Sequence, residues 1–169
     1  MNAVLLSVSA ICAATDLKSR KIYNAVVFPA LAAALILRVA LGGWPELADG
    51  LLGFAAGLGI LLIPYLLGGM GAGDVKLLAV VGALKGAAFV LAASFCMAAI
   101  GAVLALGVML RYGGVRSRIR QWGLWLLCLR LRIWPSPSRG AAEAVTYPYG
   151  VAIAGGAVLC WALEGWGAA

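Results

Sequence analysis

Long apolar stretches separated by short polar breaks run through almost the whole chain. Four of them approach or meet the roughly 20 residues that a helix needs to cross the hydrocarbon core of a membrane. They are residues 25–43, 47–67, 87–110 and 149–166. A shorter fifth stretch covers residues 1–15. The pattern therefore predicts a bundle of transmembrane helices.

Residues 75–84 form one more apolar stretch, which is too short to span alone. Fused to the next stretch as far as Leu110, it would make an implausibly long single span, and Lys85-Gly86 offers a natural break between the two. We therefore expect a short fourth helix here. The fold class predicted is an all-α integral membrane protein with six transmembrane helices.

The first stretch ends in Cys12-Ala13-Ala14, which superficially matches a signal-peptide cleavage site. A signal peptide has its positive charges before the apolar stretch, whereas here Lys18, Arg20 and Lys21 follow it. We expect a retained first helix whose N-terminus lies outside the cell.

Charge tests this topology, because Lys and Arg accumulate in cytoplasmic segments. With six helices and an external N-terminus, every Lys and Arg except Arg38 and Lys85 falls on the cytoplasmic side. Five helices would put the arginine-rich residues 111–148 on the wrong side. The six-helix bundle is thus a single domain, residues 1–169, with a basic cytoplasmic loop at 111–148.

Within that loop, residues 121–133 combine Trp and Leu with flanking arginines. The segment is too short to span, and we expect an amphipathic stretch at the lipid headgroups. A nucleic-acid patch would need a basic face with stacking aromatics in a soluble context, so the partner predicted is the bilayer and not nucleic acid.

Composition narrows the chemistry. Hydrophobic residues make up 64% of the chain and charged residues 11%, against about a quarter charged in soluble domains. The 23 glycines suit close helix packing in lipid. No histidine is present, which excludes Ser-His-Asp triads and imidazole metal sites. Four scattered cysteines form no Cys-x-x-Cys pair, so we expect neither metal nor cofactor.

Two of the six acidic residues, Asp16 and Asp74, stand at cytoplasmic ends of different apolar stretches. The simpler interpretation of each is a solvated flank or a helix cap, with Asp74 capping a helix that begins at Val75. Asp74 follows the glycine-rich run 68–73, where irregular backbone is expected. Irregular backbone at membrane depth is tolerated only inside protein or beside a watery cavity. Two acids at one membrane edge favour a functional site.

These residues resemble the type IV prepilin peptidases, membrane aspartic proteases of the Gly-x-Gly-Asp type. The matching residues are Asp16 with Ile22 and Asn24, the run Gly71-Ala72-Gly73-Asp74-Val75-Lys76-Leu77-Leu78, and Pro148-Tyr149-Gly150-Val151-Ala152. The resemblance covers essentially the whole chain. It departs at Tyr23, where the family usually has Pro, and it lacks the Cys-x-x-Cys insert and N-methyltransferase of larger members.

The resemblance implies the short, peptidase-only form associated with Flp-type pili. Asp16 and Asp74 would be catalytic, and Gly71, Gly73, Lys76 and Asn24 would shape the loop or contact the substrate. The substrate implied is a prepilin with a short basic leader, cut at the cytoplasmic face of the bacterial inner membrane by a multi-pass protein.

Two carboxylates that share one proton can hold and activate a water. The start of a helix favours a negative charge on Asp74, which suggests Asp16 as the protonated partner, an assignment left open by their coupling. Three alternatives compete: a small proton-coupled transporter, a non-enzymatic assembly factor of a secretion system, and a presenilin-like protease. For the last, the chain has no Pro-Ala-Leu motif.

Overall fold

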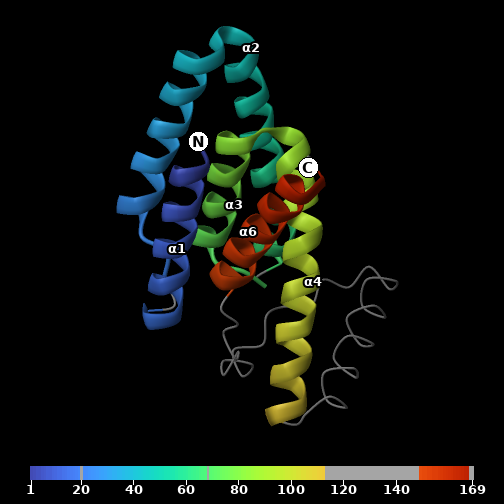
Figure 1. The fold of residues 1–169 in the computed structure, drawn as a ribbon. Helices are drawn as coiled ribbons and strands as arrows, with labels where there is room; N and C mark the ends of the chain where they lie inside the picture. Colours follow the sequence, from blue (N-terminus) through green and yellow to red (C-terminus); the bar gives the residue numbers. More distant parts are fainter. Residues whose placement is uncertain (20, 68, 113–148, 168–169) are drawn as a thin grey trace, which may run out of the picture. The chain divides into compact units, whose positions relative to one another are not determined.

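The computed structural model describes residues 1–19, 21–67, 69–112 and 149–167, and every regular element within these ranges is a helix. The helices are α1 (Asn2–Ser19), α2 (Asn24–Leu66), α3 (Ala72–Lys85), α4 (Ala87–Tyr112) and α6 (Tyr149–Gly167) (Figure 1). The predicted all-α class is confirmed for these residues. The amphipathic segment 121–133, and the loop 111–148 beyond the end of α4, lie outside them.

The chain divides into two compact units. One consists of Met1–Gly101 with Pro148–Ala169, and the other is Ala102–Tyr147. The first unit contains α1, α2, α3, the start of α4 and α6, and the architecture below is that of this unit.

Helix α2 is bent at Gly43 into two arms, residues 24–42 and 44–66. Gly43 has φ 65° and ψ −149°, a conformation outside the helical region that glycine adopts without steric cost. Pro45 lies two residues later, in the first turn of the second arm, where its missing N–H costs nothing. In Figure 1 the chain rises through the first arm, turns over and descends through the second. The two predicted stretches at 25–43 and 47–67 therefore correspond to these arms.

Helix α3 is the core of the unit. Its residues from Val75 to Leu84 are buried, apart from the partly exposed Lys76. A Cβ at Gly53 in the second arm would lie 2.2 Å from the Gly82 carbonyl oxygen, and one at Gly57 would lie 2.6 Å from that of Leu78. The two helices thus approach backbone to backbone through glycines four residues apart, as the glycine-rich composition predicted.

The break between α3 and α4 falls at Gly86, where it was predicted. Gly86 has φ 94°, which ends α3 at Lys85 and allows α4 to begin at Ala87. The N–H of Ala87 donates a hydrogen bond of 3.2 Å to Asp49 Oδ1. The carboxylate of Asp49 therefore satisfies one of the free amides at the start of α4.

A buried arginine ties this end of the unit together. Arg38 is 1% exposed, and its guanidinium donates to the Ala83 carbonyl at 2.8 Å, to Glu46 Oε2 at 2.9 Å and to Asp49 Oδ2 at 3.0 Å. We call Arg38, Glu46 and Asp49 the Arg38 cluster. The cluster joins the bend of α2 to the end of α3. Arg38, which the sequence analysis used only as a topology marker, therefore has a structural role.

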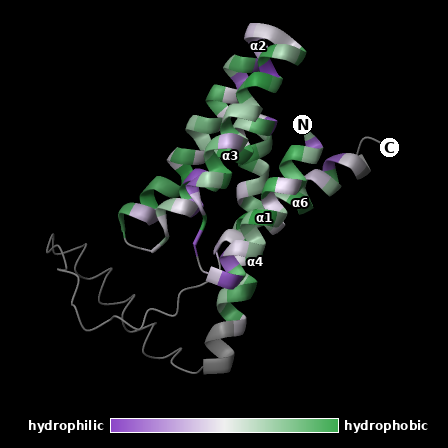
Figure 2. Cartoon of the chain, turned by 90° about the vertical axis from the view of Figure 1, so that its left-hand side faces the viewer, coloured by the Kyte–Doolittle hydropathy of each residue, from purple (hydrophilic) through white to green (hydrophobic). Residues whose placement is uncertain are grey.

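Hydrophobic residues make up most of the described helices (Figure 2). Phe95, Trp44 and Leu41 are 78%, 76% and 71% exposed, and apolar surface on this scale marks an interaction with lipid or another protein. Two helices, Asn24–Leu66 and Ala87–Gly107, are long and apolar enough to cross a membrane, and Tyr149–Gly165 is a shorter apolar helix. With 14 residues, α3 is about 20 Å long and too short to cross alone. Six crossings and the external N-terminus stay predictions.

Candidate active site

Asp16 comes from the last turn of α1. The helix continues to Ser19, so the carboxylate projects from helical backbone and not from the polar linker that follows it. Its side chain is buried, with 6% of the residue exposed, and Oδ2 has no hydrogen-bond partner among the described residues. An unpartnered buried carboxylate oxygen is costly, and this is typical of a group kept for chemistry.

Asp74 is fixed in the first turn of α3. The helix begins at Ala72 with Gly71 as its N-cap, so the alternative in which Asp74 caps a helix beginning at Val75 put the helix start three residues too late. Asp74 Oδ2 accepts a hydrogen bond of 3.2 Å from the Gly71 N–H, and its own N–H donates to the Gly71 carbonyl at 3.1 Å. These reciprocal bonds hold the carboxylate in one orientation.

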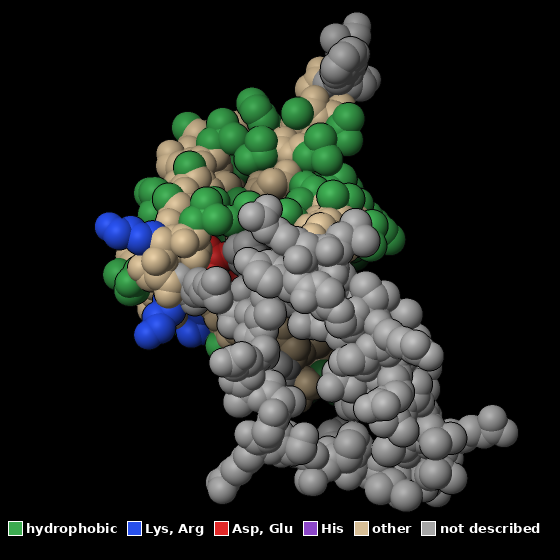
Figure 3. All heavy atoms as spheres, turned by 90° about the horizontal axis from the view of Figure 1, so that it is seen from below, with side chains coloured by type: hydrophobic (Ala, Val, Ile, Leu, Met, Phe, Trp, Pro, Cys, Tyr) green, Lys and Arg blue, Asp and Glu red, His purple; other side chains and the backbone are tan. Residues whose placement is uncertain are grey.

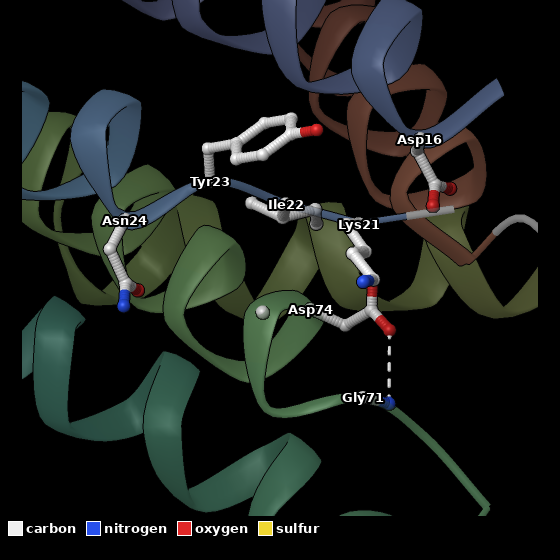
Figure 4. A pocket seen from close by; sticks show the side chains of 8 residues that line it. Asp16, Lys21, Ile22, Tyr23, Asn24, Gly71 and Asp74 are labelled. Carbon is white, nitrogen blue, oxygen red and sulfur yellow. Dashed lines mark hydrogen bonds between the residues drawn. The ribbon is translucent and has the colours of Figure 1, made fainter. Parts of the chain in front are cut away.

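One pocket of about 370 Å³ receives both carboxylates (Figure 4). Asp16 enters from α1 and Asp74 from α3, and the linker between α1 and α2 forms another wall. The lining residues are Asp16, Lys21, Ile22, Tyr23, Asn24, Gly71, Gly73 and Asp74. We call this the aspartate pocket. From below, Figure 3 shows a small acidic patch, Lys and Arg side chains at the edge on one side of it, and hydrophobic side chains over much of the rest of the coloured surface.

The structure brings five of the six predicted site residues to this pocket. Gly73 lies against Ile22, because a Cβ there would come within 2.9 Å of the Ile22 Cβ. A side chain at position 73 would therefore displace the linker from the start of α3. Sequence reasoning missed Lys21 and Tyr23 as lining residues, although both stand between Asp16 and Asn24 in the matching motif.

Lys76 is the predicted residue that does not line the pocket. Its ammonium donates to Asn24 Oδ1 at 3.1 Å and lies 5.5 Å from the centroid of the Phe28 ring. Both partners belong to the first arm of α2. Lys76 therefore ties α3 to α2 behind Asn24, which agrees with a loop-shaping role and not with direct substrate contact.

The environment of Asp74 shifts its ionisation. Asp74 precedes the apolar residues 75–84, and burial raises its pKa from 3.8 to about 6, with a further rise from the nearby charge of Asp16. The hydrogen bond from the Gly71 N–H opposes this rise without cancelling it. The position of Asp74 in the first turn of a helix suggested the opposite direction, so burial outweighs the helix dipole here.

The first turn of helix α6 lies against Asp16. A Cβ at Gly150, in the first turn of α6, would lie 2.8 Å from Asp16 Oδ2 and 3.0 Å from its Cγ. Residues far apart in the sequence, Asp16 and Gly150, thus meet at the site. No group of three or more His, Cys, Asp or Glu side chains that could hold a metal occurs among the described residues.

Comparison with known proteins agrees with this geometry. A sequence model of the type IV leader peptidase family matches residues 3–106, a range that contains both aspartates. No curated protein and no solved structure matches the chain. The match covers more than half of the sequence and favours a protease over the transporter and assembly-factor alternatives. The chain belongs to the type IV leader peptidase family.

Proposed function

We propose that the protein is an aspartic endopeptidase that removes the leader peptide from type IV prepilins of the Flp type. The observation that carries this proposal is the convergence of two buried carboxylates from different helices, Asp16 and Asp74, on one pocket. Two adjacent carboxylates that share a proton are the arrangement by which proteins hydrolyse amides without a metal or a nucleophilic side chain.

The two carboxylates have different roles in this mechanism. Asp74 holds the shared proton, because its pKa is raised to about 6 by burial. Asp16 is then the general base, and its carboxylate lies against the first turn of α6. This order is the reverse of the one suggested by the sequence.

The reaction then needs no other group. Asp16 removes a proton from water as the water oxygen attacks the scissile carbonyl carbon, and Asp74 donates its proton to the carbonyl oxygen. The tetrahedral intermediate collapses when the proton on Asp16 passes to the amide nitrogen and the C–N bond breaks. The hydroxyl proton returns to Asp74 as the carboxylic acid product forms, which restores the starting state.

The substrate follows from the surroundings of the pocket. The apolar outer surface suits a substrate whose mature part is a hydrophobic helix in the membrane. The predicted topology puts the pocket at the cytoplasmic edge of the bacterial inner membrane, where the junction between a basic leader and that helix would lie. The short form without a Cys-x-x-Cys insert suggests a Flp-like prepilin and no methyltransferase activity.

The test is cleavage of a purified Flp-like prepilin by the purified protein in detergent. We expect one shorter product whose N-terminal sequence begins at the leader junction, formed in the presence of EDTA. Glu164→Gln is the control for loss of a carboxylate outside the pocket, because Glu164 forms an exposed ion pair with Lys85. This variant should cut like the wild type. Failure of the wild-type protein to cut, or loss of cutting with EDTA that a divalent metal restores, would contradict the proposal.

A further inference from the structure

The closest constraint on Asp16 comes from Gly150, at the other end of the described chain. The ideal Cβ position at Gly150 lies 2.8 Å from Asp16 Oδ2, 3.0 Å from Cγ and 3.1 Å from Cβ. Two of these distances are at or below the shortest separations that real Cβ atoms show. The carboxylate therefore occupies the space that any side chain at position 150 would need.

Other glycines of α6 have different surroundings from Gly150. Helix α6 contacts α4 through Gly156, where a Cβ would lie 2.6 Å from the Met97 backbone nitrogen. Farther along the same helix, Gly165 has nothing within 4 Å of its Cβ position. Three glycines of one helix thus face a carboxylate, a backbone and open space, respectively.

The Asp16 oxygen nearest to Gly150 is buried and has no hydrogen-bond partner within the part of the chain that the structure describes. Asp74 Oδ2, in contrast, is fixed by the Gly71 N–H. Hydrogen bonds therefore orient one member of the pair, and steric contact with Gly150 limits the other. Gly150 lies outside the residues that the family model matches, 3–106.

We propose that Gly150 is a positioning residue that seats the Asp16 carboxylate against the first turn of α6 and so aims it at the water shared with Asp74. The role rests on the proposed function. Ala at this position forces Asp16 away from its seat. A misplacement of about 1 Å at a reacting group costs on the order of a hundredfold in rate.

The first arm of the experiment compares steady-state cleavage of a Flp-like prepilin by the wild type and by Gly150→Ala, Gly156→Ala and Gly165→Ala. We expect Gly150→Ala to lower kcat about a hundredfold with KM within about threefold, because the leader-binding surface is unchanged. Gly165→Ala should match the wild type. Gly156→Ala should lower the midpoint of thermal unfolding while its folded fraction keeps a near wild-type kcat.

The second arm measures thermal unfolding and needs no activity. Gly150→Ala should lower the unfolding midpoint in the wild-type background. In an Asp16→Ala background it should leave the midpoint unchanged or raise it, because the collision is gone and Ala is the better helix former. This double-mutant cycle also covers the case in which Gly150→Ala alone folds poorly.

Two results would overturn the positioning role. One is a kcat within about threefold of wild type for Gly150→Ala, and the other is an equal loss of unfolding midpoint in both backgrounds. A wild-type protein that does not cut prepilin would instead refute the proposed function. The stability cycle would still decide whether Gly150 seats Asp16.

Discussion

The protein has two polar clusters inside an apolar helix bundle, and they are built on opposite principles. In the Arg38 cluster the buried guanidinium donates to carbonyl groups and to two carboxylates. In the aspartate pocket two acids share a cavity, and no described residue donates a hydrogen bond to Asp16 Oδ2. The hydrogen bonds of the Arg38 cluster stabilise the fold. The aspartate pocket instead keeps a carboxylate oxygen available to bind water and substrate.

Removing the guanidinium of the Arg38 cluster should have the largest effect on stability. Arg38→Met leaves the Ala83 carbonyl without its donor and removes the partner of two carboxylates that are each about half exposed. Loss of a buried donor and its charge-assisted hydrogen bonds costs about 2–3 kcal/mol. Thermal or denaturant unfolding in detergent measures the loss. Lys85→Met is the matched control, because it breaks the more exposed Lys85–Glu164 pair and should cost under about 1 kcal/mol. Equal losses would remove the contrast between the clusters.

In the aspartate pocket, loss of charge should instead stabilise the fold. The pKa of Asp74 is raised to about 6, so the folded state binds the proton more tightly than the unfolded state. Its stabilising contribution is fully present below about pH 4 and is lost as pH rises through about 6, a loss of roughly 2 kcal/mol. Asp74→Asn should not show this loss. A parallel pH dependence of unfolding in both proteins would contradict the assignment.

The rate of prepilin cleavage should depend on pH through the same titration of Asp74. If Asp74 must hold the shared proton, kcat/KM falls as pH rises above about 6 and approaches a tenfold loss per pH unit. Cleavage assays between about pH 5 and pH 8 measure the slope, with folding monitored in parallel. A flat profile across this range would mean that Asp74 reacts as the anion.

The smallest effect is expected at the tie between α3 and α2. Lys76→Met removes the exposed hydrogen bond to Asn24 Oδ1, and the net contribution of such a bond is about 1 kcal/mol or less. Cleavage should fall by less than about fivefold. If Lys76 acts through Asn24, the double variant with Asn24→Ala should be no slower than Asn24→Ala alone. An additive loss would mean direct contact between Lys76 and the substrate.

Much of the fold was predictable because its breaks have local causes. The bend at Gly43 and the break at Gly86 both use glycines with positive φ, and both fall between apolar stretches. The start of α3 was misplaced because glycines have low helix propensity. There the contact of Gly73 with Ile22 and the Gly71–Asp74 bonds override propensity.

The two aspartates were predictable from their motifs, whereas their surroundings were not. Lys21 and Tyr23 line the pocket because of the path of the linker between α1 and α2. The hydrophobic periodicity of the sequence does not predict that path. The partners of Arg38 come from the bend of α2 and from the end of α3. The contact of Gly150 with Asp16 joins opposite ends of the described chain. Each of these depends on tertiary packing, which one sequence does not encode locally.

The most direct test of the account is the kinetics of Asp16→Asn, Asp74→Asn and their double variant with a purified prepilin. Each single variant should lose at least about a thousandfold in kcat/KM while remaining folded, because Asn keeps the shape of Asp but neither accepts the water proton nor shares one. The double variant should be scarcely slower than the worse single, as expected of residues that act as a unit. Full processing by both single variants would end the peptidase proposal, and loss with only one would remove the paired-carboxylate mechanism.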